Sequence, residues 1–167
     1  VERSALRFPH KDAFRCADKV ISYGELDIRS SQLALQLRAL GVRKGARIGI
    51  YMNRCLETAV AVYGILKSGG AYVPLDPFAP VSRTHGILED CGIEILISQG
   101  VPQKKLEQLV GDTSTIRTIV GEVHLAGVAS VSWDIVFSYP LKGYVAVPLL
   151  EEDLAFILYT SGSTGAP

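Results

Sequence analysis

Residues 47–75 read RIGIYMNRCLETAVAVYGILKSGGAYVPL, and this stretch decides the fold. Its first five residues, 47–51, form a short apolar run typical of a buried strand, whereas 56–66 is long and apolar enough for a mostly buried helix. The small residues 68–70 end that helix, and 71–75 form a second apolar run. A strand, a helix and a strand in this order predict a parallel βαβ unit with a right-handed crossover.

The same alternation continues on both sides of this unit. Before it, leucines recur at helical spacing from residue 26 to residue 40, and Gly41 follows where a left-handed C-terminal cap is favoured. After it, the sequence predicts helices at 80–90 and 103–110 and strands at 94–98 and 115–120. We therefore expect an α/β protein with a mostly parallel sheet flanked by helices.

The C-terminal part of the chain has a less regular pattern. Residues 128–136 are compatible with a strand and 138–143 with a turn, so we expect an irregular connection over 121–152. The apolar run 154–159 then predicts a final strand. In open α/β sheets, ligands bind beyond the carboxyl ends of the strands, so we expect the residues after 159 at such an edge.

Composition limits the classes of partner. The chain has 167 residues with 48% hydrophobic content, which is enough for the core of one domain. Lysine plus arginine and aspartate plus glutamate number 17 each, so no net charge attracts nucleic acid or an anionic membrane. The apolar runs fall short of the roughly 20 residues that span a bilayer. We expect no nucleic-acid partner and no membrane span.

Cysteine and histidine give no sign of a metal site. The residues are Cys16, Cys55, Cys91, His10, His85 and His124. The cysteines are odd in number and far apart, and their spacing matches neither a disulfide framework nor a zinc site. They fit reduced thiols, which favours the cytoplasm.

The stretch after the last predicted strand is rich in hydroxyl side chains and glycine. Its six residues are Thr160, Ser161, Gly162, Ser163, Thr164 and Gly165. Glycine permits close backbone approach, and serine and threonine add hydrogen-bond donors, so this composition suits a phosphate group. The spacing fits neither G-x-x-x-x-G-K-[ST] nor G-x-G-x-x-G, and it lacks the G-x-S-x-G pattern of a serine nucleophile. An ordinary flexible loop has the same composition.

Three segments together resemble one family. Residues 154–167, LAFILYTSGSTGAP, are similar to the phosphate-loop motif of the adenylate-forming (AMP-binding) superfamily, which contains acyl-CoA synthetases, luciferases and the adenylation domains of nonribosomal peptide synthetases. Residues 21–26, ISYGEL, and 66–77, LKSGGAYVPLDP, match further elements in the same order. The last segment is most similar to amino-acid-activating members. The resemblance covers about 8–167 and corresponds to the N-terminal part of such an enzyme.

This resemblance implies an ATP-dependent ligase that also uses Mg²⁺. A small carboxylic or amino acid would join the α-phosphate of ATP, giving an acyl-adenylate and pyrophosphate, and would then pass to a thiol of coenzyme A or phosphopantetheine. The six residues from Thr160 to Gly165 would bind the phosphates, with the hydroxyls of Ser161, Ser163 and Thr164 as donors. The resemblance places neither a catalytic residue nor a metal ligand within these 167 residues.

The resemblance also implies a single partial domain over 1–167. It corresponds to the N-terminal subdomain of a larger adenylation domain, whose remaining parts would follow Pro167. The fragment by itself is then expected to be inactive. We expect it to self-associate through apolar surface that the missing subdomain covers, and an acyl carrier protein is an expected partner of the whole enzyme.

Two alternatives stay open at this point. The parent could be an acyl-CoA ligase or an amino-acid adenylation domain, because the residues that choose the acid lie beyond 167. The chain could also be a non-catalytic α/β module that binds a nucleotide or a partner.

Several single residues carry structural expectations. Asp76 is expected to cap a turn, Pro74 to end a strand and Trp133 to pack into the edge of the core. The adjacent charges at 104–105 and at 89–90 are expected on solvated faces.

Overall fold

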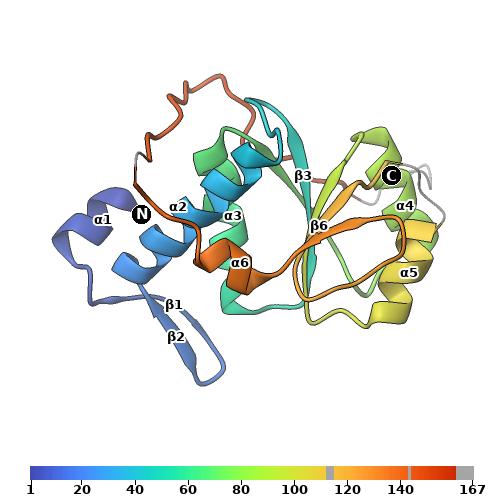
Figure 1. Ribbon diagram of the computed structural model, residues 1–167, viewed down its shortest axis with the longest axis horizontal. Coiled ribbons are helices and arrows are strands. Elements are labelled where there is room, and N and C mark those ends of the chain that lie inside the picture. The colour runs from blue at the N-terminus through green and yellow to red at the C-terminus, as the bar shows by residue number, and fades with distance from the viewer. Residues whose placement is uncertain (112–114, 143, 161–167) are drawn as a thin grey trace.

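A five-stranded parallel sheet forms the centre of the protein in the computed structural model, which describes residues 1–111, 115–142 and 144–160 (Figure 1). The strand order is β4-β3-β5-β6-β7. The strands are β3 (Arg47–Met52), β4 (Ala71–Leu75), β5 (Ile95–Gln99), β6 (Thr118–Val120) and β7 (Ala129–Val131). The predicted α/β fold with a mostly parallel sheet is confirmed.

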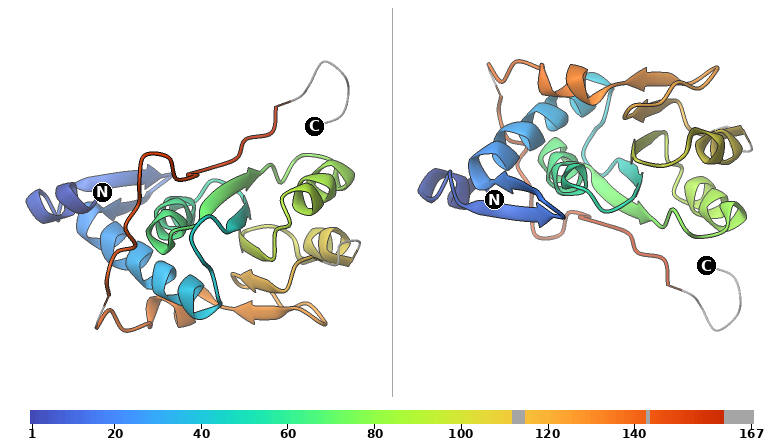
Figure 2. Two further views of the ribbon diagram at one scale, coloured as in Figure 1. Left: turned by 90° about the horizontal axis from the view of Figure 1, so that it is seen from above. Right: turned by 90° about the horizontal axis from the view of Figure 1, so that it is seen from below.

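Helices cover both faces of this sheet (Figures 1 and 2). They are α2 (Tyr23–Ala39), α3 (Leu56–Ser68), α4 (Val81–Asp90), α5 (Gln103–Gly111) and α6 (Trp133–Phe137). Side chains alternate between the faces along each strand. Ile48 and Ile50 therefore pack with α2 and α3, whereas Tyr51 and Leu96 pack in a second cluster with α4 and α5.

The βαβ unit over 47–75 forms as the sequence predicts. Strands β3 and β4 pair in parallel from Arg47 opposite Ala71 to Tyr51 opposite Leu75. Helix α3 crosses between them and ends at Gly69, whose φ of 87° is left-handed. Glycine adopts this conformation without a Cβ clash, so the C-terminal cap follows directly from the sequence.

Helices α2 and α3 pack closely, and two features fix their contact. A Cβ on Gly64 would lie 2.6 Å from Leu33 Cδ2, so only glycine permits this approach. The ammonium group of Lys67 donates to Asp27 Oδ1 at 2.6 Å, to the Asp27 carbonyl at 3.0 Å and to Ser31 Oγ at 2.9 Å. The Lys67 side chain is only 9% exposed, so these contacts replace its water shell.

The N-terminal segment adds elements that the sequence patterns did not reveal. Helix α1 (Glu2–Arg7) precedes an antiparallel hairpin of β1 (Asp12–Cys16) and β2 (Lys19–Ser22). Ser22 Oγ accepts a hydrogen bond from the Glu25 amide at 3.2 Å and caps α2. The helix therefore starts at Tyr23, three residues before the leucine pattern begins at residue 26.

The irregular connection contains two short elements. Strand β7 is shorter than the predicted 128–136, because Ser132 accepts a hydrogen bond from the Ile135 amide at 3.3 Å and begins α6. Trp133 is 5% exposed, and its indole N–H donates to Gln99 Oε1 at 3.0 Å. The expected packing of this tryptophan at the core edge is confirmed.

Within the described residues, none of the helices has the length and apolar content that crossing a bilayer requires.

Candidate functional site

Residues 144–160 cross the molecule as an extended segment that passes the outer edge of β4 (Figure 2). We call this segment the tail. Tyr72 of β4 donates its amide to the Ala155 carbonyl at 3.1 Å and accepts from the Ile157 amide at 3.1 Å. The two contacts form one isolated parallel bridge between Tyr72 and Phe156.

The predicted strand over 154–159 is therefore wrong beyond this one bridge. Backbone groups that face the same neighbour alternate along a strand, so Pro74 is the next β4 residue on the outer edge. Proline has no N–H to donate, and the ladder cannot continue past it. Pro74 lies inside β4, which runs to Leu75, so it ends the outer pairing rather than the strand.

The end of the tail is attached to α4 through Tyr159. Its hydroxyl hydrogen-bonds to Asp90 Oδ2, and it lies 3.2 Å from Cys91 Sγ. Ile157 and Tyr159 also pack against the apolar cluster between the sheet and α4. Burial raises the pKa of the Tyr159 hydroxyl, and its hydrogen bond to Asp90 raises it further, so the hydroxyl stays a donor. Asp90 is exposed, as expected, and it is also the hydrogen-bond partner of Tyr159.

The Tyr159 hydroxyl is attached where α4 ends. Asp90 is the last residue of α4 and Cys91 is its C-cap, and β5 begins four residues later at Ile95. A crossover helix ends where its following strand starts, so Tyr159 is attached near the amino edge of the sheet. The expectation for the residues after 159 stays a prediction, because the structure describes only Thr160 among them.

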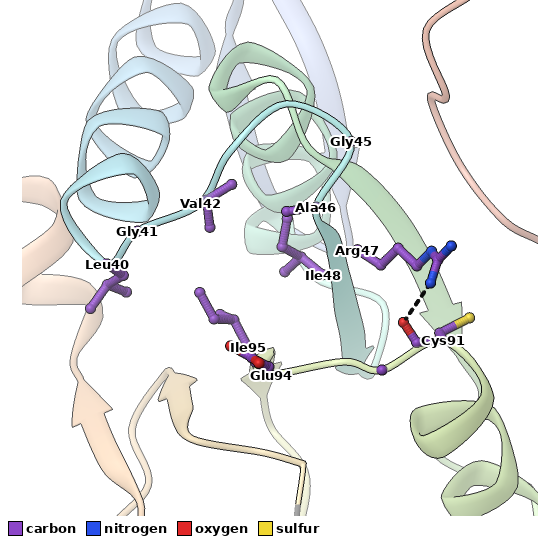
Figure 3. Close-up of a pocket in the computed structure, with 11 residues that line it drawn as sticks. Leu40, Gly41, Val42, Gly45, Ala46, Arg47, Ile48, Cys91, Glu94 and Ile95 are labelled. Carbon is purple, nitrogen blue, oxygen red and sulfur yellow. Dashed lines mark hydrogen bonds between the residues drawn. The ribbon is translucent and has the colours of Figure 1, made fainter.

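A cavity of about 270 Å³ adjoins the same turn (Figure 3). Backbone around Gly41 and Gly45 lines it, together with Arg47, Cys91 and Glu94. The Arg47 guanidinium donates to the Cys91 carbonyl at 3.2 Å, which joins the start of β3 to the end of α4. The Cys91 backbone and thiol therefore contact two different parts of the chain.

Of the six predicted phosphate-binding residues, the structure describes one. Thr160 is exposed and follows Tyr159 directly. Ser161, Gly162, Ser163, Thr164 and Gly165 lie outside the described residues. The phosphate contacts of these residues stay a prediction.

The turn after β4 has two polar contacts. Asp76 Oδ1 accepts from the Phe78 amide at 2.8 Å, which confirms the predicted cap. Lys105 of α5 donates to the Pro77 carbonyl, so it contributes to this turn and is not simply solvated, whereas Lys104 is exposed.

Two buried hydroxyl groups at the carboxyl half of the sheet escaped the sequence analysis. Tyr51 and Ser98 are opposite each other on β3 and β5, and both are fully buried. Among the described residues, neither hydroxyl has a hydrogen-bond partner. Burial raises the pKa of Tyr51, and the charge of Asp76 adds to this shift.

The described residues offer no cluster of three histidine, cysteine or acidic side chains that could hold a metal ion. Cys16 and Cys55 are half-buried free thiols and Cys91 is a buried one. Burial is the main cause of the raised pKa of Cys55.

Comparison with known sequences decides the family. Residues 1–167 match the family described as AMP-binding enzyme. The chain belongs to this family. The resemblance of the segments at 21–26, 66–77 and 154–167 is thereby confirmed.

Relatives of this AMP-binding chain include much longer synthases. It is 36% identical over 167 residues to Tyrocidine synthase 2 of Brevibacillus parabrevis, covering 99% of this chain and 4% of that protein. It is 30% identical over 167 residues to N-(5-amino-5-carboxypentanoyl)-L-cysteinyl-D-valine synthase of Penicillium rubens, covering 100% of this chain and 4% of that protein. The chain thus spans a few per cent of these relatives.

Solved structures share the fold of this AMP-binding chain. The anthranilate CoA ligase AuaEII in complex with anthranoyl-AMP matches with a TM-score of 0.87 and 25% identity, covering 99% of this chain and 32% of that one. The nonribosomal peptide synthetase FmoA3, in its α-methyl-L-serine-AMP bound form, matches with a TM-score of 0.73 and 28% identity. The match covers 96% of this chain and 16% of that one.

Proposed function

We propose that this chain is the N-terminal part of an adenylation domain in an ATP-dependent ligase. A carboxylate oxygen of the acid attacks the α-phosphorus of ATP, the bond to the β-phosphate breaks, and an acyl-adenylate and pyrophosphate form. A thiol then attacks the acyl carbon and AMP leaves. The observation that carries this proposal is the 36% identity to Tyrocidine synthase 2 across almost the whole chain.

We propose an amino acid as the acid and phosphopantetheine on a carrier protein as the thiol acceptor. This choice is supported by the relative whose named product joins cysteinyl and valine units, and by the likeness to a nonribosomal peptide synthetase. The likeness to a CoA ligase supports the alternative, in which coenzyme A takes the acyl group. ATP as substrate and three free thiols fit a cytoplasmic protein.

The residues from Thr160 to Gly165 bind the β- and γ-phosphates in this proposal. Thr160 is exposed, so its hydroxyl and amide are accessible to a ligand. Loop amides and hydroxyls would stabilise negative charge on the departing pyrophosphate. Mg²⁺, when bound with ATP, neutralises part of the same charge. The described residues provide no three-residue cluster for it.

The isolated chain is proposed to be inactive, with the rest of the domain following Pro167. Several large side chains of the tail are exposed, which supports self-association of the isolated chain. They are Leu149, Leu150, Leu154, Phe156 and Leu158.

Amino-acid-dependent exchange of labelled pyrophosphate into ATP tests the proposal. The sample is the protein in which this chain continues into the rest of the domain, with twenty amino acids and a matched set of carboxylic acids. We expect exchange with a narrow set of amino acids and a strong loss in Gly162→Val at unchanged melting temperature. Exchange with none of the acids, together with micromolar binding of ATP by the isolated chain, would favour the non-catalytic module instead.

A further inference from the structure

The tail ends in a contact that the proposed reaction does not yet use. We propose that Tyr159, Asp90 and Cys91 form an anchor that positions the phosphate loop, and we call these three residues the tail anchor. The loop is residues 160–165, so the anchor fixes the residue directly before it. This inference rests on the proposed function, in which the loop binds ATP.

The Tyr159 contact lies directly before the loop. Within the described residues, the Tyr159 side chain makes the last attachment of the tail before exposed Thr160. The preceding backbone attachment is the single bridge at Phe156, a residue that is itself 47% exposed. Leu158, between the two attachments, is 61% exposed. The hydroxyl contact therefore decides where the loop begins.

The backbone of Asp90 and Cys91, which Tyr159 contacts, is held firmly by its neighbours. Cys91 is 4% exposed, and its carbonyl accepts from Arg47 of β3 (Figure 3). Asp90 ends a helix whose Ile87 and Leu88 are buried in the core. The backbone that carries the Asp90 and Cys91 side chains is thus fixed to the central sheet, while the Asp90 side chain itself is exposed.

The end of α4 that Tyr159 contacts is negatively charged. The C-terminal end of a helix carries partial negative charge, and Asp90 adds a carboxylate there. A phosphate is repelled from such a place, so Tyr159 does not point toward a site that favours ATP phosphates. It is a positioning residue that acts through the loop, and the loop itself contacts the ligand.

The consequence for catalysis follows from the entropy of ordering. Fixing the residue before a binding segment lowers the entropy that ordering this segment on ATP costs. Loss of the anchor weakens ATP binding in the ground state and in the transition state alike. Uniform weakening of this kind raises KM and leaves kcat nearly unchanged.

Three substitutions in the protein that carries the complete domain test the anchor. Tyr159→Phe removes only the hydroxyl, and Asp90→Ala removes its acceptor. Loss of a hydrogen bond to a charged group corresponds to about a tenfold change in equilibrium. We therefore expect KM for ATP to rise about tenfold in both, with kcat and KM for the acid within about twofold. Asp90→Asn keeps an acceptor oxygen but loses the charge, so its KM for ATP should lie between those of Asp90→Ala and the unmodified protein.

Glu89→Gln is the matched control. Glu89 lies next to Asp90 on α4, is exposed, and its carboxylate lies 3.6 Å from His85 Nδ1. It should leave KM for ATP within about twofold of the unmodified protein. An unchanged KM in Tyr159→Phe and Asp90→Ala, or an equal rise in Glu89→Gln, overturns the anchor.

Amide hydrogen exchange in the same proteins separates the anchor from the proposed function. The Ile157 amide donates to the Tyr72 carbonyl, so its protection reports docking of the tail. We expect this amide to exchange several-fold faster in Tyr159→Phe, with the amides of β5 unchanged. Faster exchange in a protein that adenylates no acid would retain the anchor and reject the ligase. An unchanged Ile157 amide in an active ligase would reject the anchor and retain the ligase.

Discussion

The contact between α2 and α3 and the docking of the tail are two different ways of holding one chain together. The helices share a broad apolar contact, a glycine that admits Leu33, and a buried ion pair at Lys67. The tail is attached by a few separate contacts, at Val145, Asp153, Phe156 and Tyr159. Many redundant contacts stabilise a fold, whereas a few separate ones can position a segment and still let it move. Substitutions in the first region should change global stability, and those in the second should act locally.

We expect the largest change in the free energy of unfolding when a buried apolar side chain between α2 and α3 is shortened. Leu33 is fully buried against Gly64, so Leu33→Ala should lower the free energy of unfolding by about 3 kcal/mol. Leu158→Ala is the matched truncation in the tail, where the side chain is exposed, and should change it by less than about 0.5 kcal/mol. Urea denaturation measures both. If both variants lost the same free energy of unfolding, the helix contact and the tail would not differ in the way proposed.

The buried ion pair should give the next largest effect. Lys67→Met leaves the Asp27 carboxylate and the Ser31 hydroxyl without their ammonium partner, so we expect a loss of about 2 kcal/mol in the free energy of unfolding. Lys44→Met breaks the corresponding pair of the tail, in which Lys44 lies 2.7 Å from Asp153 Oδ2. This control should leave the urea midpoint of the core unchanged, because the Lys44 side chain is 43% exposed and the pair lies outside the core. A shift in the control as large as that in Lys67→Met would contradict the comparison.

Removing an unpartnered buried hydroxyl should raise the free energy of unfolding, by less than the two preceding substitutions lower it. The hydroxyls of Tyr51 and Ser98 are buried without a hydrogen-bond partner among the described residues. Tyr51→Phe and Ser98→Ala should each raise the free energy of unfolding by about 1 kcal/mol, because the folded state no longer buries an unsatisfied polar group. Thermal and urea denaturation test the sign. A loss in both variants would indicate that a bound water or ligand pairs these hydroxyls.

The smallest expected effect is a pH dependence confined to the tail. The Leu150 amide donates to Asp153 at 2.6 Å, and this contact, followed by Lys44, holds the pKa of Asp153 below its usual value of about 4. Because the pKa of Asp153 is lower in the folded protein than in the unfolded chain, its carboxylate stabilises the tail fully above the usual pKa. This stabilisation is lost as the pH falls through the lowered pKa.

The NMR shift of the Leu150 amide should therefore titrate below pH 4 while the amides of α3 do not. Asp153→Asn should abolish this titration. A Leu150 shift that stays constant down to the acid unfolding transition would show that Asp153 does not fix this part of the tail.

Local sequence determined most of the central layers. The βαβ unit over 47–75 was predictable because apolar runs, helix length and the glycine after Ser68 all depend on neighbouring residues. Helix α5 at Gln103–Gly111 and strand β5 at Ile95–Gln99 also fall within a residue or two of the expected ranges. The family was recognisable for the same reason, since its motifs are short and continuous.

The hairpin of β1 and β2 was missed because its strands are short and half exposed. Each carries charged residues, Arg15 and Lys19 among them, and neither shows an apolar run of the kind that predicts a strand. Its pairing gains stability from packing against α2 and α3, which the sequence pattern does not reveal.

The candidate site shows most clearly what only the tertiary structure decided. The sequence by itself determined that a hydroxyl- and glycine-rich loop follows an apolar run, and the described structure leaves that loop a prediction beyond Thr160. The structure decided that the run pairs only once, since Pro74 offers no N–H to the edge. It also decided that Tyr159 meets Asp90, 69 residues away. Such a contact depends on how whole layers pack, and no local pattern of residues encodes that packing.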